Sequence, residues 1–299
     1  MAVRAYGALL DGILAARDAG ALRRAHGRLV AVGLAPHPFL RCKLLSAYAA
    51  CSRPAEAHLL LSFLSSSHRR PPLFALNSLL RSSPSASASL RLFRRMLLLG
   101  PGPDARSFAA ALSSAAPSLR LARLLHAAAL VAGLLRDPVL PPSLISAYSR
   151  GGDLASARRV LDETPQRGRT LAAWTAMIAA CGAHGRAAEA VEIFEREAAG
   201  GGDAAAATAV LAACARAGMV AAARRVFARL GRPALQHYTC MVDVLGRAGL
   251  VEEAEALIAG METEPDDALW ATLLGACRMH ARLDVAERVA NRVYGLKLA

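Results

Sequence analysis

The feature of this chain that most restricts its fold is a segment of roughly 33 residues that recurs along the sequence. The clearest copies begin at residues 173, 206, 237 and 269, and the third reads HYTCMVDVLGRAGLVEEAEALI. Each copy places a small residue early in its second half and an apolar residue four positions later on the same helical face. Equivalent positions, spaced by 31 to 35 residues, occur at 22, 57, 89, 122, 157, 190, 223, 254 and 286.

Each repeat is predicted to form two helices joined by a short turn. Five residues before the small position lies Gly185, Gly218 or Gly249, and in the last copy Ala281. Glycine suits the end of the first helix because it adopts positive φ angles without steric cost.

Nine such pairs predict an all-α protein. Two short antiparallel helices cannot bury their apolar faces alone, so neighbouring pairs must stack into a solenoid with an inner and an outer layer. The composition agrees, since 55% of residues are apolar but only 5% are aromatic. We expect one right-handed superhelical α-solenoid over 1–299, with repeats at 3–37, 38–72, 73–104, 105–137, 138–170, 171–203, 204–234 and 235–266 and a final motif at 267–299.

One stretch allows another interpretation. Residues 81–90, RSSPSASASL, have the composition of a low-complexity linker. The repeat spacing continues through them, so we favour a shortened or frayed turn inside a repeat.

The charge of the chain suggests a polyanionic partner. The formal net charge is +13, and all basic residues except Lys43 and Lys297 are arginines. Polyanions bind such surfaces with release of counterions. No uninterrupted apolar run has transmembrane length, so we expect a soluble chain without a membrane partner.

With the period established, the residues resemble the pentatricopeptide repeat family of plant organelles. LISAYSRGGDLASARRVLDETP (144–165) resembles a short repeat of its PLS subclass, and AWTAMIAACGAHGRAAEAVEIF resembles a standard repeat. Residues 267–299 resemble the E-type motif that follows the last repeat. The resemblance covers almost the whole chain and is strongest from residue 138 onward.

The resemblance implies ordered binding of single-stranded RNA, with one base per repeat read by two side chains. These are the fifth and the last residue of each repeat. Frames that begin at 73, 171 and 235 give Asn77 with Asp104, Thr175 with Asp203, and Thr239 with Asp266, which the family's code assigns to U, G and G. Other frames fit the code poorly: Cys42, Ala109 with Asp137, Pro142 with Thr170, and Thr208 with Ala234.

Each of these assignments has a structural alternative. An aspartate that closes a repeat is also a typical N-cap of the next helix, and we expect both roles to coexist. Thr175 and Thr239 could be ordinary polar residues of a first turn. The pairs Arg23–Arg24, Arg158–Arg159 and Arg224–Arg225 recur on second helices, where we favour a solvated outer face over a track for phosphates.

No catalytic arrangement is evident in the sequence. Cys181, Cys214 and Cys277 share one repeat position with Tyr48 and Tyr148, which indicates packing between helices. The chain has no HxE and no CxxC, so it lacks the motifs of the zinc-dependent DYW deaminase domain that PLS proteins often carry. We expect no enzyme activity, no metal and no cofactor, and a deaminase recruited in trans through the E-type motif.

We therefore expect an RNA-binding adaptor in organelle RNA processing, and we favour one that selects sites for C-to-U editing. Splicing or stabilisation of organelle RNA, and a protein-binding scaffold of the tetratricopeptide type, remain alternatives. The resemblance implies an organelle, with the mitochondrion favoured over the chloroplast. An arginine-rich N-terminus is compatible with a transit peptide but also fits the first repeat.

Overall fold

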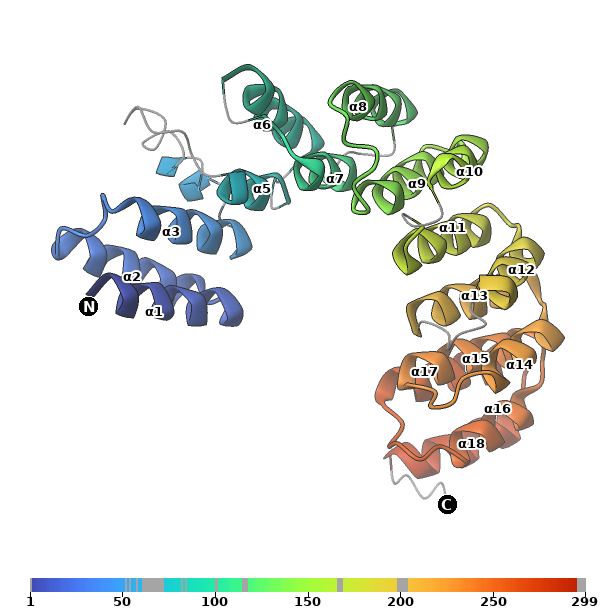
Figure 1. Ribbon diagram of the computed structural model, residues 1–299. Coiled ribbons are helices and arrows are strands. Elements are labelled where there is room, and N and C mark those ends of the chain that lie inside the picture. The colour runs from blue at the N-terminus through green and yellow to red at the C-terminus, as the bar shows by residue number, and fades with distance from the viewer. Residues whose placement is uncertain are drawn as a thin grey trace. The chain divides into compact units, whose positions relative to one another are not determined.

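The computed structural model (Figure 1) describes residues 2–51, 53, 55–57, 59–60, 73–81, 83, 85–99, 102–114, 118–165, 169–197 and 204–294. All regular structure in these ranges is helical, and no strand occurs among them. The prediction of an all-α chain is therefore confirmed. None of the helices in these ranges combines the length and hydrophobicity needed to cross a membrane.

The helices alternate between first and second members of successive repeats. The first helices are α1 (Ala2–Ala16), α3 (Pro38–Ala50), α5 (Leu73–Arg81), α7 (Ala105–Ser114), α9 (Leu140–Arg150), α11 (Leu171–Ala183), α13 (Ala204–Ala217), α15 (Leu235–Arg247) and α17 (Asp267–Met279). The second helices are α2 (Ala19–Ala31), α6 (Ala86–Leu99), α8 (Leu119–Val131), α10 (Leu154–Glu163), α12 (Ala187–Glu197), α14 (Val220–Ala228), α16 (Val251–Ala259) and α18 (Leu283–Tyr294).

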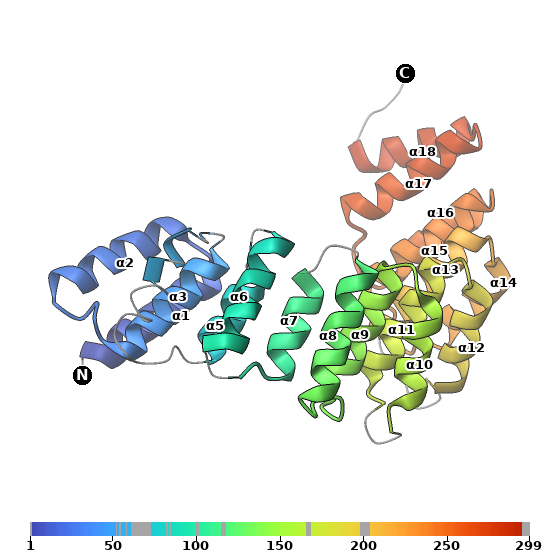
Figure 2. The same ribbon diagram turned by 90° about the horizontal axis from the view of Figure 1, so that it is seen from above.

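Packing divides the chain into an N-terminal unit, Met1–Ala147, and a C-terminal unit, Tyr148–Ala299. In the N-terminal unit the first helices α1, α3, α5 and α7 contact one another in sequence order. The second helices form another layer, in which α2 packs on α1 and α3, α6 on α5 and α7, and α8 on α7 (Figure 2).

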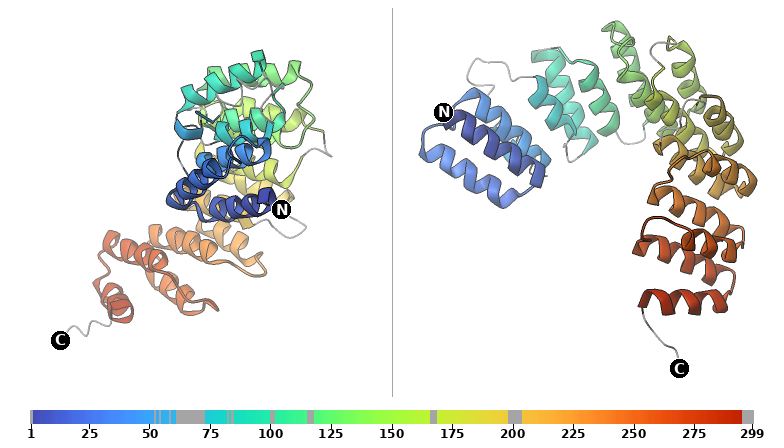
Figure 3. Two further views of the ribbon diagram at one scale, coloured as in Figure 1. Left: turned by 90° about the vertical axis from the view of Figure 1, so that its left-hand side faces the viewer. Right: turned by 60° about the horizontal axis from the view of Figure 1, so that its bottom comes forward.

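The C-terminal unit repeats this arrangement. First helices α11, α13, α15 and α17 pack side by side, and α12, α14, α16 and α18 form the second layer (Figures 1 and 3). Contacts between α12 and α14 and between α16 and α18 continue along that layer. Stacked helical hairpins are the predicted solenoid architecture, which the structure confirms.

The small residue lies in the core in all repeats except the last, where Ala286 is half-buried and Val285 is buried instead. Ala157, Ala190, Ala223 and Ala254 are completely buried, and so is Leu22 at the equivalent position of the first repeat. A small side chain here lets the second helix approach its neighbours closely, while the residue four positions on, such as Phe194, fills the space beside it. The recurring small residue thus sets the packing of the two layers.

The turns have the predicted backbone conformation. Gly185, Gly218 and Gly249 have φ angles of 73°, 67° and 78°. Ala281, which replaces glycine in the last repeat, has a φ of 53° and so adopts a left-handed conformation that costs an L-residue about 1 kcal/mol. The turn geometry is therefore imposed by the repeat and not by glycine alone.

Two helical glycines mark close contacts between first helices. A Cβ atom placed on Gly246 of α15 would lie 2.6 Å from Cβ of Ala276 on α17, and one on Gly182 of α11 would lie 2.8 Å from Cβ of Ala213 on α13. Both glycines occupy the same position of their repeats. The spacing of adjacent first helices in the C-terminal unit depends on them.

The serine-rich stretch at 81–90 belongs largely to helices. It contains the last residue of α5 and the first five of α6, and the Ser85 hydroxyl accepts a hydrogen bond from the amide of Ala88 (3.2 Å). Positions 82 and 84 lie outside the described residues. The described part supports a turn inside a repeat over a linker.

Candidate functional site

The structure joins Asn77 and Asp104, which are 27 residues apart, by a direct hydrogen bond. Asn77 lies on α5 and Asp104 immediately precedes α7. Nδ2 of Asn77 donates to Oδ1 of Asp104 over 3.1 Å. Asn77 is only 7% exposed, so this polar pair sits at the edge of the packed layer and not on an open surface.

Ser107 completes the network. Its hydroxyl oxygen lies 2.6 Å from Oδ1 of Asn77 and 2.8 Å from Oδ1 of Asp104. The hydroxyl has a single proton, so it can donate to only one of these acceptors at a time. Because Asp104 and Ser107 contact opposite ends of the Asn77 amide, they hold that amide in one orientation.

Asp104 also caps α7. Its Oδ1 accepts the backbone N–H of Ser107 over 2.8 Å, and its own backbone N–H donates to the Ser107 hydroxyl over 3.2 Å. This reciprocal pattern is a capping box. Burial opposes ionisation of the carboxyl, but hydrogen bonds from Ser107 and Asn77 outweigh it and hold the pKa of Asp104 below its ordinary value. Here the capping and pairing roles coexist.

Sequence reasoning did not select Ser107. Its signal was present, because an N-cap residue followed three positions later by a hydrogen-bonding side chain is the pattern of a capping box. The contact with Asn77, which spans 30 residues, depends on the packing of α5 against α7 and has no local signal.

The three threonines of the predicted site share one local conformation. The hydroxyls of Thr175, Thr208 and Thr239 donate to the carbonyl oxygens of Leu171, Ala204 and Leu235 over 2.8 to 3.0 Å. Each bond runs to the residue four positions earlier in the same helix, a common arrangement for helical threonine. The hydroxyl proton of each threonine is therefore used within its own helix.

The aspartates paired with these threonines are less uniform. Asp266 caps α17, where its Oδ1 accepts the amide of Leu269 over 2.8 Å. Both residues of the Thr239 and Asp266 pair are described, and no hydrogen bond joins them. Asp203, the predicted partner of Thr175, lies outside the described residues.

Positions that fit the code poorly have local structural roles. Thr170 caps α11 by accepting the amide of Ala173 (3.3 Å), and Asp137 accepts the amide of Val139 (3.0 Å). Both residues stabilise the start of a first helix or the turn before it. The last residue of a repeat is thus used repeatedly as a cap.

Arginines on second helices of the C-terminal unit form ion pairs with the neighbouring second helix. Arg158 on α10 pairs with Glu189 on α12. Two arginines of α14 pair in opposite directions along the layer, Arg225 with Glu195 on α12 (3.3 Å) and Arg224 with Glu253 on α16 (2.5 Å). In this unit the arginines are part of a solvated face, as favoured from the sequence.

The recurring cysteines are packing residues. Cys181, Cys214 and Cys277 are buried within first helices. Burial raises the pKa of all three thiols, and that of Cys181 to about 11, so they remain protonated at neutral pH. Within the described ranges no group of three His, Cys, Asp or Glu side chains is arranged to hold a metal ion.

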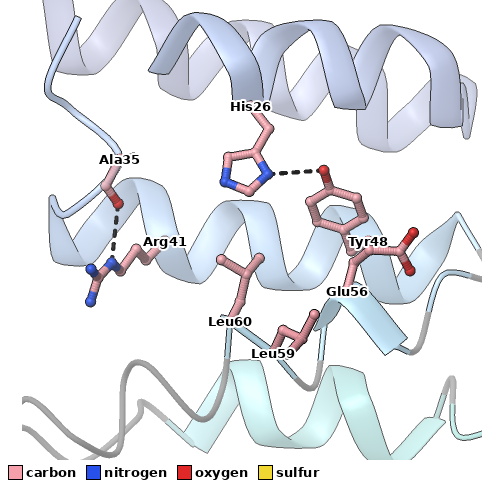
Figure 4. Close-up of a pocket in the computed structure, with 7 residues that line it drawn as sticks. All are labelled: His26, Ala35, Arg41, Tyr48, Glu56, Leu59 and Leu60. Carbon is pink, nitrogen blue, oxygen red and sulfur yellow. Dashed lines mark hydrogen bonds between the residues drawn. The ribbon is translucent and has the colours of Figure 1, made fainter. Parts of the chain in front are cut away.

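A cavity of about 320 Å³ lies beside α2 and α3 (Figure 4). Nδ1 of His26 and the Tyr48 hydroxyl are hydrogen-bonded at 3.0 Å, and burial lowers the pKa of His26 and raises that of Tyr48. Glu56 is bound by Arg53, and Nε of Arg41 donates to a backbone carbonyl. These groups are engaged with one another and form no catalytic arrangement.

Comparisons with known proteins identify the repeat. The profile described as PPR repeat matches residues 143–169, 172–196 and 237–264. Among curated proteins of Arabidopsis thaliana, the mitochondrial pentatricopeptide repeat-containing protein At5g46460 is 30% identical over 283 residues, covering 91% of this chain and 40% of that protein. The mitochondrial protein At3g26782 is 38% identical over 186 residues (60% and 28%), and the chloroplastic protein CRR2 is 30% identical over 227 residues (71% and 34%).

A solved structure shares the fold. The crystal structure of the pentatricopeptide repeat protein PPR10 in complex with an 18-nt psaJ RNA element superposes with a TM-score of 0.65 at 19% identity, covering 94% of this chain and 44% of that chain. This chain spans between 28% and 40% of the length of the curated relatives described above.

Proposed function

The chain carries the repeats of a pentatricopeptide repeat protein, and from that premise we propose that it is a non-enzymatic adaptor that binds single-stranded RNA in a sequence-specific manner. Each repeat that presents a suitable pair of side chains reads one base. The observation that carries the proposal is the hydrogen-bonded pair of Asn77 and Asp104, which joins the fifth and last residues of one repeat. PPR10, which shares the fold, was crystallised with RNA.

The orientation of Asn77 explains how such a pair can select a base. An ionised Asp104 can only accept hydrogen bonds, so the Asn77 atom that faces it is the nitrogen. Ser107 occupies the amide oxygen, and the second amide hydrogen has no acceptor among the described residues. A fixed donor matches a carbonyl on the Watson–Crick edge, as in uracil, and not the amino group of cytosine or adenine.

We propose that the third to eighth repeats bind the base sequence UNNGNG, in which N stands for any base. Asn77 with Asp104 belongs to the third repeat, Thr175 with Asp203 to the sixth and Thr239 with Asp266 to the eighth, counted from the frames given above. Thr208, in the seventh repeat, is paired with Ala234, which cannot form a base-edge hydrogen bond, so that position should accept any base. One repeat for one base then places U three nucleotides before the first G.

For the cellular role we propose recognition of C-to-U editing sites in an organelle, with the mitochondrion favoured over the chloroplast. The relatives described above include proteins named as mitochondrial and one named as chloroplastic. The deaminase, supplied by another editing factor, would contact the E-type motif over 267–299, whose described part comprises α17 and α18. Roles in organelle RNA splicing or stability use the same RNA-binding groove and differ only in the factor recruited.

The editing role predicts a specific defect in a plant that lacks this protein. Organelle transcripts are sequenced and compared with organelle DNA. One or a few cytidines should remain unconverted, each preceded upstream by UNNGNG, because without the adaptor the deaminase is not delivered to those sites. Unchanged editing with altered introns or transcript ends would contradict the deaminase partnership but retain RNA binding.

A further inference from the structure

The net positive charge of the chain lies entirely in one of its two units. The N-terminal unit contains 18 Arg and Lys residues and 5 Asp and Glu residues, whereas the C-terminal unit contains 18 of each. The N-terminal unit therefore carries the whole formal charge of +13, and the C-terminal unit is neutral. A polyanion would be attracted mainly to residues 1–147.

In the C-terminal unit the outer arginines are neutralised within the protein. The ion pairs of α10, α12 and α14 described above continue to α18, where Arg288 pairs with Glu255 on α16 over 2.7 Å. Arg282, just before α18, pairs with Glu252 on α16 and with Asp284. Because carboxylates lie beside these guanidinium groups, the electrostatic attraction of this surface for an external anion is weak.

The second helices of the N-terminal unit have few carboxylates near them. Asp18 attracts Arg24 and Glu56 attracts Arg23, but neither of these two pairs forms an ion pair. The described parts of α2, α6 and α8 contain no Asp or Glu. All five carboxylates of the unit have other partners: Asp11 pairs with Lys43, Asp18 caps α2, Glu56 binds Arg53, Asp104 belongs to the Asn77 network, and Asp137 accepts the amide of Val139.

Eight exposed arginines lie on these three helices, and we call six of them the outer arginine face. None of the six forms an ion pair with any described residue. Arg24 and Arg28 are one helical turn apart, and so are Arg91 and Arg94, so like charges are neighbours on the surfaces of α2 and α6. The outer arginine face consists of Arg23, Arg24 and Arg28 on α2, Arg91 and Arg94 on α6, and Arg120 on α8.

We propose that the outer arginine face binds the phosphodiester backbone of the RNA that flanks the segment read by the first helices. The proposal rests on the proposed function, since it assumes that RNA is the partner. Guanidinium groups match phosphate oxygens in a bidentate geometry, and phosphate binding removes the repulsion between neighbouring arginines. Since the face belongs to the second-helix layer, it is separate from Asn77 and the threonines on first helices.

Another polyanion, an anionic bilayer, is the competing partner. Exposed aliphatic residues, Val30, Leu98 and Val131, lie at or near the ends of the same three helices. We favour RNA because the arginines are distributed over three second helices, those of the first, third and fourth hairpins, as a contact with an extended strand requires. They also carry the charge without aromatic residues that would anchor a bilayer. Binding to a bilayer would depend on the exposed aliphatic residues, whereas binding to RNA would not. An experiment can therefore distinguish the two partners.

The test compares two variants of the full chain that lose the same charge. In the first, the six residues of the outer arginine face are changed to Gln. In the second, six ion-paired arginines of the C-terminal unit are changed to Gln: Arg158, Arg224, Arg225, Arg247, Arg282 and Arg288. Circular dichroism of both variants verifies that the helices are retained.

Affinity is measured by fluorescence anisotropy, as a function of salt concentration, for an RNA that carries UNNGNG with unstructured flanks. The slope of log K against log salt should become shallower by up to about 4 in the first variant, roughly 0.7 for each lost phosphate contact. The second variant should retain the wild-type slope. An RNA trimmed to the UNNGNG segment should show no difference between the first variant and the wild type.

Equal changes of the salt slope in both variants would show that RNA responds to the total charge of the chain and not to contacts with the outer arginine face. This result would overturn the proposal. An unchanged slope in the first variant would overturn it as well, while base selectivity of the wild type would still support the proposed function. If the wild type binds no RNA, the proposed function itself fails. Binding of anionic phosphatidylglycerol vesicles that requires both the arginines and Leu98 and Val131, with an unchanged RNA slope, would assign the face to a bilayer.

Discussion

Asp104→Ala is expected to destabilise the N-terminal unit by about 2–4 kcal/mol and to abolish the preference for U at the Asn77 register. Loss of the α7 cap accounts for about 1 kcal/mol. The Asn77 amide would remain buried without its acceptor, which costs about 1–3 kcal/mol more. Urea unfolding measures the first effect, and binding to RNAs that differ only at the U measures the second.

Asp104→Asn is the matched control for charge. It keeps the size of the side chain and one acceptor oxygen, so it should destabilise less than Ala. The pKa of Asp104 is lowered in the folded protein, so its ionised form stabilises the fold at neutral pH and that contribution disappears as the pH falls below about 4. Other carboxyl groups with a lowered pKa remain in both proteins, so both should lose stability in acid, but the wild type should lose more than Asp104→Asn. Equal stability of all three proteins at neutral pH would contradict the network.

Gly246→Ala is expected to destabilise the C-terminal unit by about 2 kcal/mol, although alanine favours helices over glycine by about 1 kcal/mol. The new methyl group would lie 2.6 Å from Cβ of Ala276, so α15 and α17 would have to separate. Overpacking of this kind costs about 1–3 kcal/mol. Because Thr239 lies on α15 and Asp266 caps α17, the separation should also weaken recognition of the second G in UNNGNG.

Gly275→Ala provides a control of opposite sign. It lies in the middle of α17, and no atom outside its own helix backbone comes within 4 Å of the added Cβ. This change should stabilise the protein by up to about 1 kcal/mol. The double variant Gly246→Ala with Ala276→Gly should recover part of the loss, because it removes the opposing methyl group. Equal effects of Gly246→Ala and Gly275→Ala in urea unfolding would contradict the close contact.

Most of the fold could be predicted because it is periodic. The spacing of small residues located the helix pairs, and the structure buries those residues in all repeats except the last, including Ala190 and Ala223. The turn glycines predicted positive φ angles, which the structure has. The same periodicity identified Ala281 as a turn residue despite its side chain. Local patterns repeated at a fixed interval are sufficient to specify stacked hairpins.

Features that depend on contacts between repeats could not be predicted in the same way. The meeting of Asn77 with Ser107 requires the packed positions of α5 and α7, and no local pattern encodes it. Ion pairing of Arg158 and Arg224 is visible only once neighbouring second helices are side by side. The division of charge was present in the sequence, but its boundary near residue 147 comes from the packing.

The claim that this chain reads RNA one base per repeat is tested most directly by selection from a random pool of single-stranded RNA. The purified chain is used, and the bound fraction is sequenced. We expect enrichment of UNNGNG, and in Thr239→Asn, which creates the same pair as Asn77 with Asp104, enrichment of UNNGNU. Bound RNA without a shared motif, or the same motif for both proteins, would contradict the account.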